Sequence, residues 1–131
     1  MILVDSSVWI DYFRGAATPT SEKLDALLRT EALYLGDLIL AEVLQGFTAD
    51  RDFERALQQL DELDCIAIAG QNGAAAAARN YRILRAQGIT VRKTIDCLIA
   101  TRCILDGYAL LYSDRDFDPF VKHLGLECAN L

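Results

Sequence analysis

The chain is predicted to form a three-layer α/β/α fold around a mostly parallel sheet of four to five strands. Short apolar runs alternate with segments of helical character along the whole chain. Hydrophobic residues make up 53% of the 131 residues, which is enough for one compact core. No linker, repeat or low-complexity tail divides the chain, so residues 1–131 are expected to fold as a single domain.

The order of elements follows from apolar spacing and from residues that begin or end helices. Gly15 is expected to end the first helix, and Asp37 to cap a helix that Gly46 ends. The predicted strands are residues 2–4, 33–35, 66–68 and 108–112, with 126–129 as the fifth. The predicted helices are residues 6–14, 18–29, 38–45, 50–63, 74–86, 95–106 and 116–123.

Four of the 19 acidic residues adjoin the most apolar stretches of the chain. Asp5 follows MILV, Glu42 lies within LILAEVL, Asp96 opens DCLIA and Asp114 follows ALLYS. Ligands bind outside the carboxyl ends of parallel strands, and Asp5 and Asp114 each come just after a predicted strand. Asp96 and Glu42 lie near the starts of predicted helices and can point at the same edge. These four residues are therefore the candidate site.

Each acid also has a purely structural explanation. Asp5 can cap the next helix, Asp96 can interact with a helix dipole, Asp114 can begin a turn, and Glu42 can face solvent. A separate structural explanation for each of the four acids is harder to accept than one shared role. Clustered carboxylates repel one another unless a divalent cation is bound, and oxygen ligands suit Mg²⁺ or Mn²⁺.

The scarcity of other reactive side chains also favours oxygen chemistry. His123 is the one histidine, so histidine-based triads and most zinc sites are disfavoured. The four cysteines are widely spaced without a C-x-x-C motif and are interpreted as small buried apolar residues. Neither a membrane span nor a secretory leader is indicated, so a cytoplasmic protein is expected.

Four sequence blocks resemble the PIN-domain family, and within it the VapC toxins of bacterial toxin–antitoxin pairs. The blocks are VDSSVWIDYFRG at 4–15, LILAEVLQG at 38–46, GITVRKTIDCLIA at 88–100 and LLYSDRDFDPF at 110–120. The resemblance covers nearly the whole chain. It implies a PIN-like fold and endoribonuclease activity that depends on Mg²⁺ or Mn²⁺. It also implies an RNA substrate, a cognate VapB-like antitoxin and a homodimer.

The same resemblance implies roles for individual residues. Asp5, Glu42, Asp96 and Asp114 would form the catalytic acidic pocket, with Asp5, Asp96 and Asp114 as direct metal ligands. Ser6 and Asp116 would support the pocket. Asp114, Asp116 and Asp118 compete for the place of the fourth acid, and Asp114 ranks first because it is nearest the strand end.

The charge distribution bears on RNA binding. The net charge is −6, yet residues 65–95 contain no acid. The candidate RNA-binding residues are Arg14, Arg79, Arg82, Arg85, Arg92 and Lys93, with Arg102 as a further one. Three of these arginines recur every three residues and so share one face of a helix. A solvated helix face, or a surface for an acidic segment of the antitoxin, would explain the same pattern.

Two other functions compete with the nuclease. A haloacid-dehalogenase-like phosphatase would need a second aspartate where Ser7 stands. A degenerate PIN-like module would bind RNA or protein without catalysis, and would be favoured if one of the four acids were missing. Trp9, Tyr12 and Phe13 are expected to pack in the core or an interface rather than to stack on bases.

Overall fold

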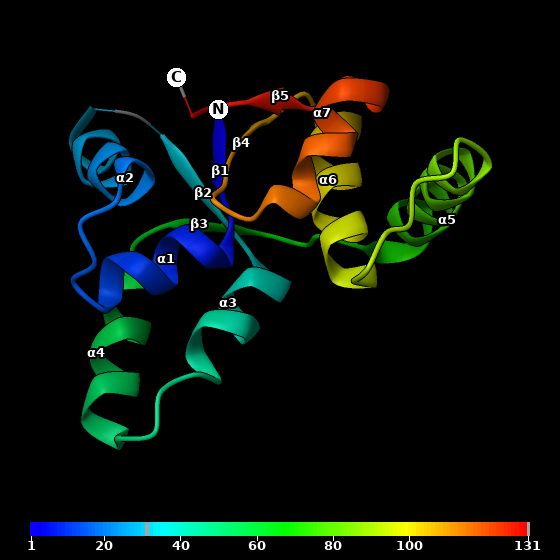
Figure 1. The fold of residues 1–131 in the computed structure, drawn as a ribbon. Coiled ribbons are helices and arrows are strands. Elements are labelled where there is room, and N and C mark those ends of the chain that lie inside the picture. The colour runs from blue at the N-terminus through cyan, green and yellow to red at the C-terminus, as the bar shows by residue number, and fades with distance from the viewer. Residues whose placement is uncertain (31, 131) are drawn as a thin grey trace.

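A five-stranded, all-parallel sheet forms the centre of the molecule (Figure 1). The computed structural model describes residues 1–30 and 32–130. The sheet has the order β3-β2-β1-β4-β5. Its strands are β1 (Ile2–Val4), β2 (Leu33–Gly36), β3 (Asp64–Ile66), β4 (Ala109–Leu111) and β5 (Glu127–Cys128). The chain moves outward from β1 to β3 and then crosses to β4, so the strand order reverses between β1 and β4.

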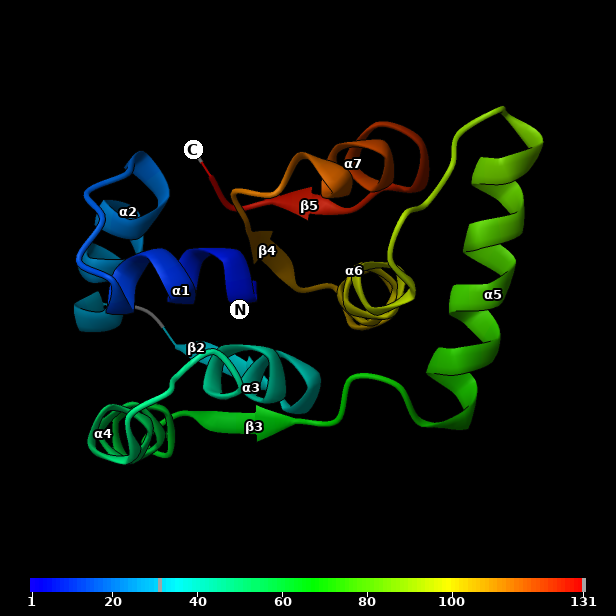
Figure 2. The same ribbon diagram turned by 60° about the horizontal axis from the view of Figure 1, so that its bottom comes forward.

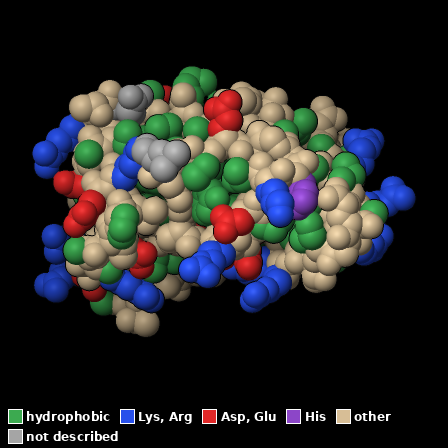
Figure 3. Space-filling view, turned by 45° about the horizontal axis from the view of Figure 1, so that its top comes forward, with side chains coloured by type: hydrophobic (Ala, Val, Ile, Leu, Met, Phe, Trp, Pro, Cys, Tyr) green, Lys and Arg blue, Asp and Glu red, His purple; other side chains and the backbone are tan. Residues whose placement is uncertain are grey.

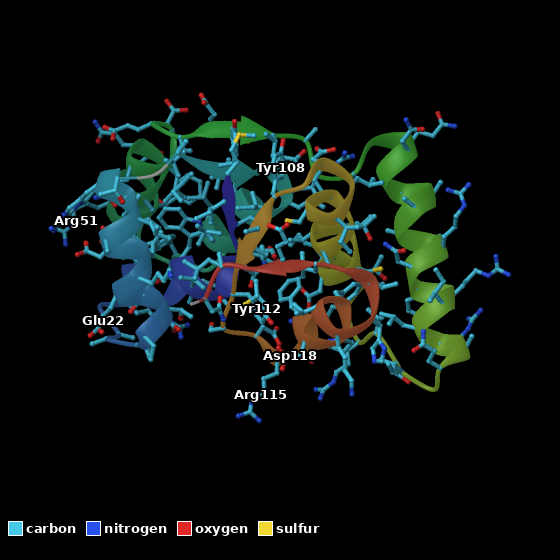
Figure 4. The ribbon with its side chains drawn as sticks, turned by 90° about the horizontal axis from the view of Figure 1, so that it is seen from above. Glu22, Arg51, Tyr108, Tyr112, Arg115 and Asp118 are labelled. Atoms are coloured by element: carbon cyan, nitrogen blue, oxygen red, sulfur yellow. The ribbon has the colours of Figure 1, made fainter. Side chains whose placement is uncertain are left out.

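Helices cover both faces of this sheet, as the alternating pattern predicts. The helices are α1 (Ser6–Phe13), α2 (Pro19–Thr30), α3 (Asp37–Leu44), α4 (Asp50–Leu60), α5 (Gly70–Ala86), α6 (Thr94–Asp106), the 3₁₀ turn η1 (Arg115–Phe117) and α7 (Asp118–Leu124). Helices α1 to α4 pack on one side, while α6 and α7 pack on the other (Figure 4). Helix α5 lies outside α6 (Figure 2). Three layers therefore form, and none of the described helices is long and apolar enough to cross a membrane.

The core lies on both sides of the central strands. Leu3 and Val4 of β1 are fully buried, as are Leu110 and Leu111 of β4. Trp9 stacks on Phe13, with ring centroids 6.0 Å apart, and Phe13 meets Phe47 edge to face at 5.8 Å. The aromatic residues of α1 thus pack against their own helix and the segment after α3, in agreement with the packing expected of them.

The cysteines only partly match their interpretation as buried apolar residues. All four are free thiols. Cys97 and Cys103 of α6 are buried, whereas Cys65 is exposed and Cys128 is half-buried. The prediction is wrong for Cys65, which lies on the edge strand β3 and is exposed.

The segment after β3 departs from the predicted elements. β3 occupies 64–66 rather than 66–68, and α5 begins at Gly70, one turn before Ala74. Side chains, and not a neighbouring strand, bind the backbone of Ile68: its N–H donates to Asp37 Oδ1 at 3.0 Å and its carbonyl accepts from Arg102 Nε at 2.8 Å. Asp37 is the first residue of α3 and does not cap it, since Gly36 occupies the cap position.

Candidate metal site at the carboxyl edge of the sheet

Asp5 stands where β1 ends and α1 begins, at the point of strand-order reversal. Its backbone N–H donates to the Leu111 carbonyl at 2.9 Å, which fixes it beside β4. One carboxylate oxygen, Oδ2, caps α1 by accepting from the Ser7 N–H at 3.1 Å and the Ser7 hydroxyl at 2.6 Å. The other oxygen, Oδ1, is buried and has no hydrogen-bond partner. The capping explanation and the functional one thus apply to different atoms of the same side chain.

Glu42 faces the interior edge of the site and not solvent. It lies on α3, and its Oε1 accepts a hydrogen bond from the Ser6 hydroxyl at 3.0 Å. Burial raises the pKa of Glu42, and the negative charges of Asp96 and Asp114 raise it further. Ser6, expected to support the pocket, therefore orients the one acid whose direction no local feature of the sequence fixes.

Three more carboxylates converge from α6 and the turn after β4. Asp96, Asp114 and Asp116 each place an oxygen so that the three atoms lie within 4.8 Å of one another. Asp96 lies in the first turn of α6, is 4% exposed, and has an Oδ2 atom without a hydrogen-bond partner. Asp114 caps η1 by accepting from the Asp116 N–H at 2.9 Å.

Two cations lie against these acids. Lys93 Nζ lies 3.0 Å from Asp114 Oδ2 and 3.4 Å from Asp96 Oδ2. Arg92 Nε lies 3.8 Å from Asp116 Oδ1. Both cations were predicted to contact RNA, and the structure places them at the rim of the acidic cluster.

The electrostatics separate the acids into two groups. Burial raises the pKa of Asp5, and it raises the pKa of Asp96 to about 6 even though Lys93 opposes the shift. Burial also acts on Asp114, but the Asp116 amide and Lys93 outweigh it and hold the pKa of Asp114 below its ordinary value. Burial therefore disfavours the charged forms of Asp5 and Asp96, whereas the partners of Asp114 favour its charged form.

The position of Asp118 narrows the choice of the fourth acid. The Tyr112 hydroxyl donates to Asp118 Oδ1 at 2.8 Å, and these two side chains lie together beside α7 (Figure 4). Arg115 points away from the molecule in the same view. Asp114 and Asp116 join the close group of carboxylates and Asp118 does not.

The arginines predicted to contact RNA are distributed over several surfaces. Arg79, Arg82 and Arg85 are exposed on α5, and the last two line an apolar groove of about 580 Å³ between α5 and α6. Arg14 is exposed after α1, beside a smaller cavity. On the face shown in Figure 3, acidic and basic side chains are interspersed among patches of hydrophobic side chains.

Arg102 has a structural role instead. Its guanidinium donates to the carbonyls of Ile68 and Ala69, at 2.8 and 2.9 Å, and it pairs with Asp106 at 3.3 Å. The interpretation of Arg102 as an RNA contact is not supported by this placement, because most of its donors are used within the fold.

The PIN domain family model matches residues 2–121, which is most of the chain. The chain belongs to the PIN domain family. Ribonuclease VapC11 of Mycobacterium tuberculosis is 32% identical over 132 residues, covering 99% of this chain and 98% of that protein.

Solved structures share the fold of this PIN domain. VapBC2 from Rickettsia felis, bound to a DNA fragment from its promoter, has a TM-score of 0.77 at 16% identity, covering 98% of this chain and 97% of that one. A toxin–antitoxin complex from Klebsiella pneumoniae has a TM-score of 0.71 at 19% identity, covering 96% and 95%. At sequence identities this low, the comparison shows a shared fold and nothing further.

One residue and one contact of the site in this PIN domain were missed by reasoning from the sequence. Ser7 makes both hydrogen bonds that hold Asp5, and its place two residues after a strand-ending acid was the available signal. The pairing of Lys93 with two acids had no comparable signal, because Asp114 is 21 residues away along the chain.

Proposed function

We propose that this PIN domain is an endoribonuclease toxin of the VapC type, dependent on Mg²⁺ or Mn²⁺ and neutralised by a cognate antitoxin. The observation that carries the proposal is the convergence of five carboxylates where the strand order reverses. The five are Asp5, Glu42, Asp96, Asp114 and Asp116.

The site fits a hard divalent cation. Asp5 Oδ1 is a buried acceptor without a hydrogen-bond partner, and Asp96 Oδ2 is buried with the ion pair to Lys93 as its contact. A carboxylate oxygen is the ligand that such cations prefer. Asp5, Asp96 and Asp114 are proposed as direct ligands, and Asp116 is near enough to complete the set. A divalent cation bound there supplies the Lewis acidity that phosphodiester hydrolysis needs without a side-chain nucleophile.

Other residues of the chain position this chemistry. Ser7 holds Asp5 through Oδ2 and leaves Oδ1 free to ligate. Ser6 holds Glu42, which is proposed as a further catalytic carboxylate of the pocket. Arg92 and Lys93 lie at the rim, where an RNA phosphate would approach.

RNA affinity is proposed to come from the basic residues. The exposed arginines of α5 add positive charge beyond the rim, and the exposed Arg14 adds a charge at the C-terminal end of α1. The mycobacterial relative is named a ribonuclease, which supports RNA as the substrate. Phosphate contacts of this kind are independent of sequence and weaken as salt is added.

The proposed partner is a VapB-like antitoxin that blocks the acidic edge, in a complex with a homodimer of this chain. The support is the likeness of fold to chains solved in VapBC and toxin–antitoxin complexes. Co-purification tests this part: an antitoxin that bound while leaving RNA cleavage intact would contradict it.

Metal-dependent RNA cleavage is the central test. The purified chain, free of antitoxin, is incubated with a pool of structured RNAs in Mg²⁺, in Mn²⁺ or in EDTA. We expect cleavage with either metal and none in EDTA, and we expect Asp96→Asn to lower the rate by orders of magnitude while RNA affinity changes little. Asp61→Asn is the matched control, because it removes the same charge at the exposed end of α4.

The outcomes separate the two leading functions. Cleavage that persists in EDTA, or that is equally fast in Asp96→Asn, would exclude the metal nuclease. Binding without cleavage across the pool would favour the non-catalytic module. Expression of the wild type alone is expected to arrest cell growth, and expression of Asp5→Asn is not.

A further inference from the structure

The Lys93 ammonium contacts two of the proposed metal ligands at once. Lys93 directly precedes α6 and adopts an extended backbone conformation, with φ −126° and ψ 123°. Its Nζ atom lies 3.0 Å from Asp114 Oδ2 and 3.4 Å from Asp96 Oδ2. One residue thus bridges an acid of α6 and an acid of the turn after β4.

The surrounding charges make this contact important. Five carboxylates gather at the site, and within the described part of the chain Lys93 and Arg92 form ion pairs with them. Arg92 reaches a single acid, Asp116, at 3.8 Å, and its side chain is 79% exposed. Lys93 is therefore the principal cation that offsets repulsion within the cluster.

We propose that Lys93 is a displaceable counter-ion of the acidic cluster, which competes with a divalent cation for Asp96 and Asp114. The inference rests on the metal site of the proposed function. An ammonium and a divalent cation compete for the same carboxylate oxygens, because two positive charges that close together repel each other. Binding of the metal is therefore expected to move the lysine.

The Lys93 side chain is free to change its conformation. Lys93 is half exposed, and its ammonium is a point charge at the end of a flexible four-carbon stem. It can leave both carboxylates by rotating its side chain without any change in α6. After displacement the ammonium is still tethered at the rim, where the phosphate of a bound RNA is the next available anion.

Two consequences follow for a chain that lacks the ammonium. With no competitor, a divalent cation should bind more tightly. Without metal, the carboxylates lose their main compensating charge, so the protein should be less stable. A lysine that only contacted RNA would produce neither effect.

The test compares Lys93→Met with Arg92→Met, which removes the same charge from the adjacent residue. Mn²⁺ affinity is measured by calorimetry, and thermal unfolding is measured in EDTA at pH 8. We expect Lys93→Met to bind Mn²⁺ about tenfold more tightly than the wild type and to unfold at a lower temperature in EDTA. Arg92→Met is expected to change the affinity less than about threefold, because its ion pair is long and exposed.

A second comparison localises the effect. In an Asp114→Asn background the destabilisation by Lys93→Met in EDTA should shrink, because the shorter of the two ion pairs is already lost. Lys93→Gln should behave like Lys93→Met. Agreement between the two variants would show that the effect comes from the loss of the ammonium and not from the methionine side chain.

The proposal is overturned if Lys93→Met leaves Mn²⁺ affinity unchanged or weakens it, or if Arg92→Met raises it equally. A wild-type chain that binds no Mn²⁺ would overturn both this proposal and the metal site. If Mn²⁺ binds, and Lys93→Met tightens it, but no RNA is cleaved, the nuclease proposal fails while the counter-ion stands.

Discussion

Asp5 shows how a single side chain serves the fold and the chemistry together. Its Oδ2 atom begins α1 through two hydrogen bonds from Ser7, while its Oδ1 atom is buried without a partner. The hydrogen bonds partly offset the cost of burial but leave the pKa raised. Replacing Asp5 therefore disturbs the helix start as well as the site, so a loss of activity there needs a folding control.

Asp96 is the cleaner residue for a test of electrostatics. Its folded pKa is about 6 against an ordinary value of 3.8, mainly because it is buried. Between those pH values the folded chain keeps a proton that the unfolded chain releases, so this residue's contribution to stability falls as the pH rises. The raised pKa values of Asp5 and Glu42 act in the same direction, and the lowered pKa of Asp114 opposes them.

In EDTA, Asp96→Asn is expected to be more stable than the wild type above pH 6, by at most about 3 kcal/mol. The difference should shrink as the pH falls from 6 towards 4, because the wild-type carboxyl is then protonated in the folded state and increasingly protonated in the unfolded state. Urea unfolding between pH 4 and 8 measures this. A difference that stayed constant with pH would show that the ionisation of Asp96 does not determine it.

At the scale of elements, the loop between β3 and α5 is held by side chains from two helices. Asp37 of α3 accepts the N–H of Ile68, and Arg102 of α6 donates to the carbonyls of Ile68 and Ala69. This arrangement explains why residues 66–68 looked like a strand, since Ile68 is fully buried. The spacing of apolar residues indicates which side chains are buried. It does not indicate which groups form hydrogen bonds with the backbone N–H and carbonyl groups.

Arg102→Met is expected to destabilise the protein by about 2–3 kcal/mol, because two loop carbonyls lose a charged donor. Its RNA affinity should be close to that of the wild type. Asp106→Asn is the matched control: it breaks only the exposed pair on the same guanidinium and should cost less than about 1 kcal/mol. Thermal unfolding and filter binding measure the two effects, and a loss of RNA binding without loss of stability would refute the structural role.

At the scale of the molecule, a mostly parallel sheet and the edge that carries the acids could be predicted from the sequence. Asp5 and Asp114 each follow an apolar run, and that local pattern is enough to place them at strand ends. The contacts between side chains from different elements could not be predicted from the sequence. The Tyr112 hydroxyl that draws Asp118 away, and the bridge from Lys93 to Asp114, depend on how η1 folds back over α6.

Metal binding should stabilise the whole domain, because the unfolded chain has no assembled site. Mg²⁺ at a hundred times its Kd is expected to add about 2.7 kcal/mol to the free energy of unfolding. For a chain of this length that corresponds to an increase in Tm of about 8 °C. Thermal scans with Mg²⁺ and with NaCl of equal ionic strength measure it. An equal increase in both salts, or an undiminished increase in Asp5→Asn, would contradict specific binding.

The hydrogen bond from the Asp5 N–H to the Leu111 carbonyl also bears on how the protein is made. A ribosome delivers Asp5 well before it delivers β4 and the turn that carries Asp114. Until β4 pairs with β1, the carboxylates that must act together lie on separate parts of an unfinished chain. The acidic site of this proposed ribonuclease is therefore assembled only after the ribosome has translated β4.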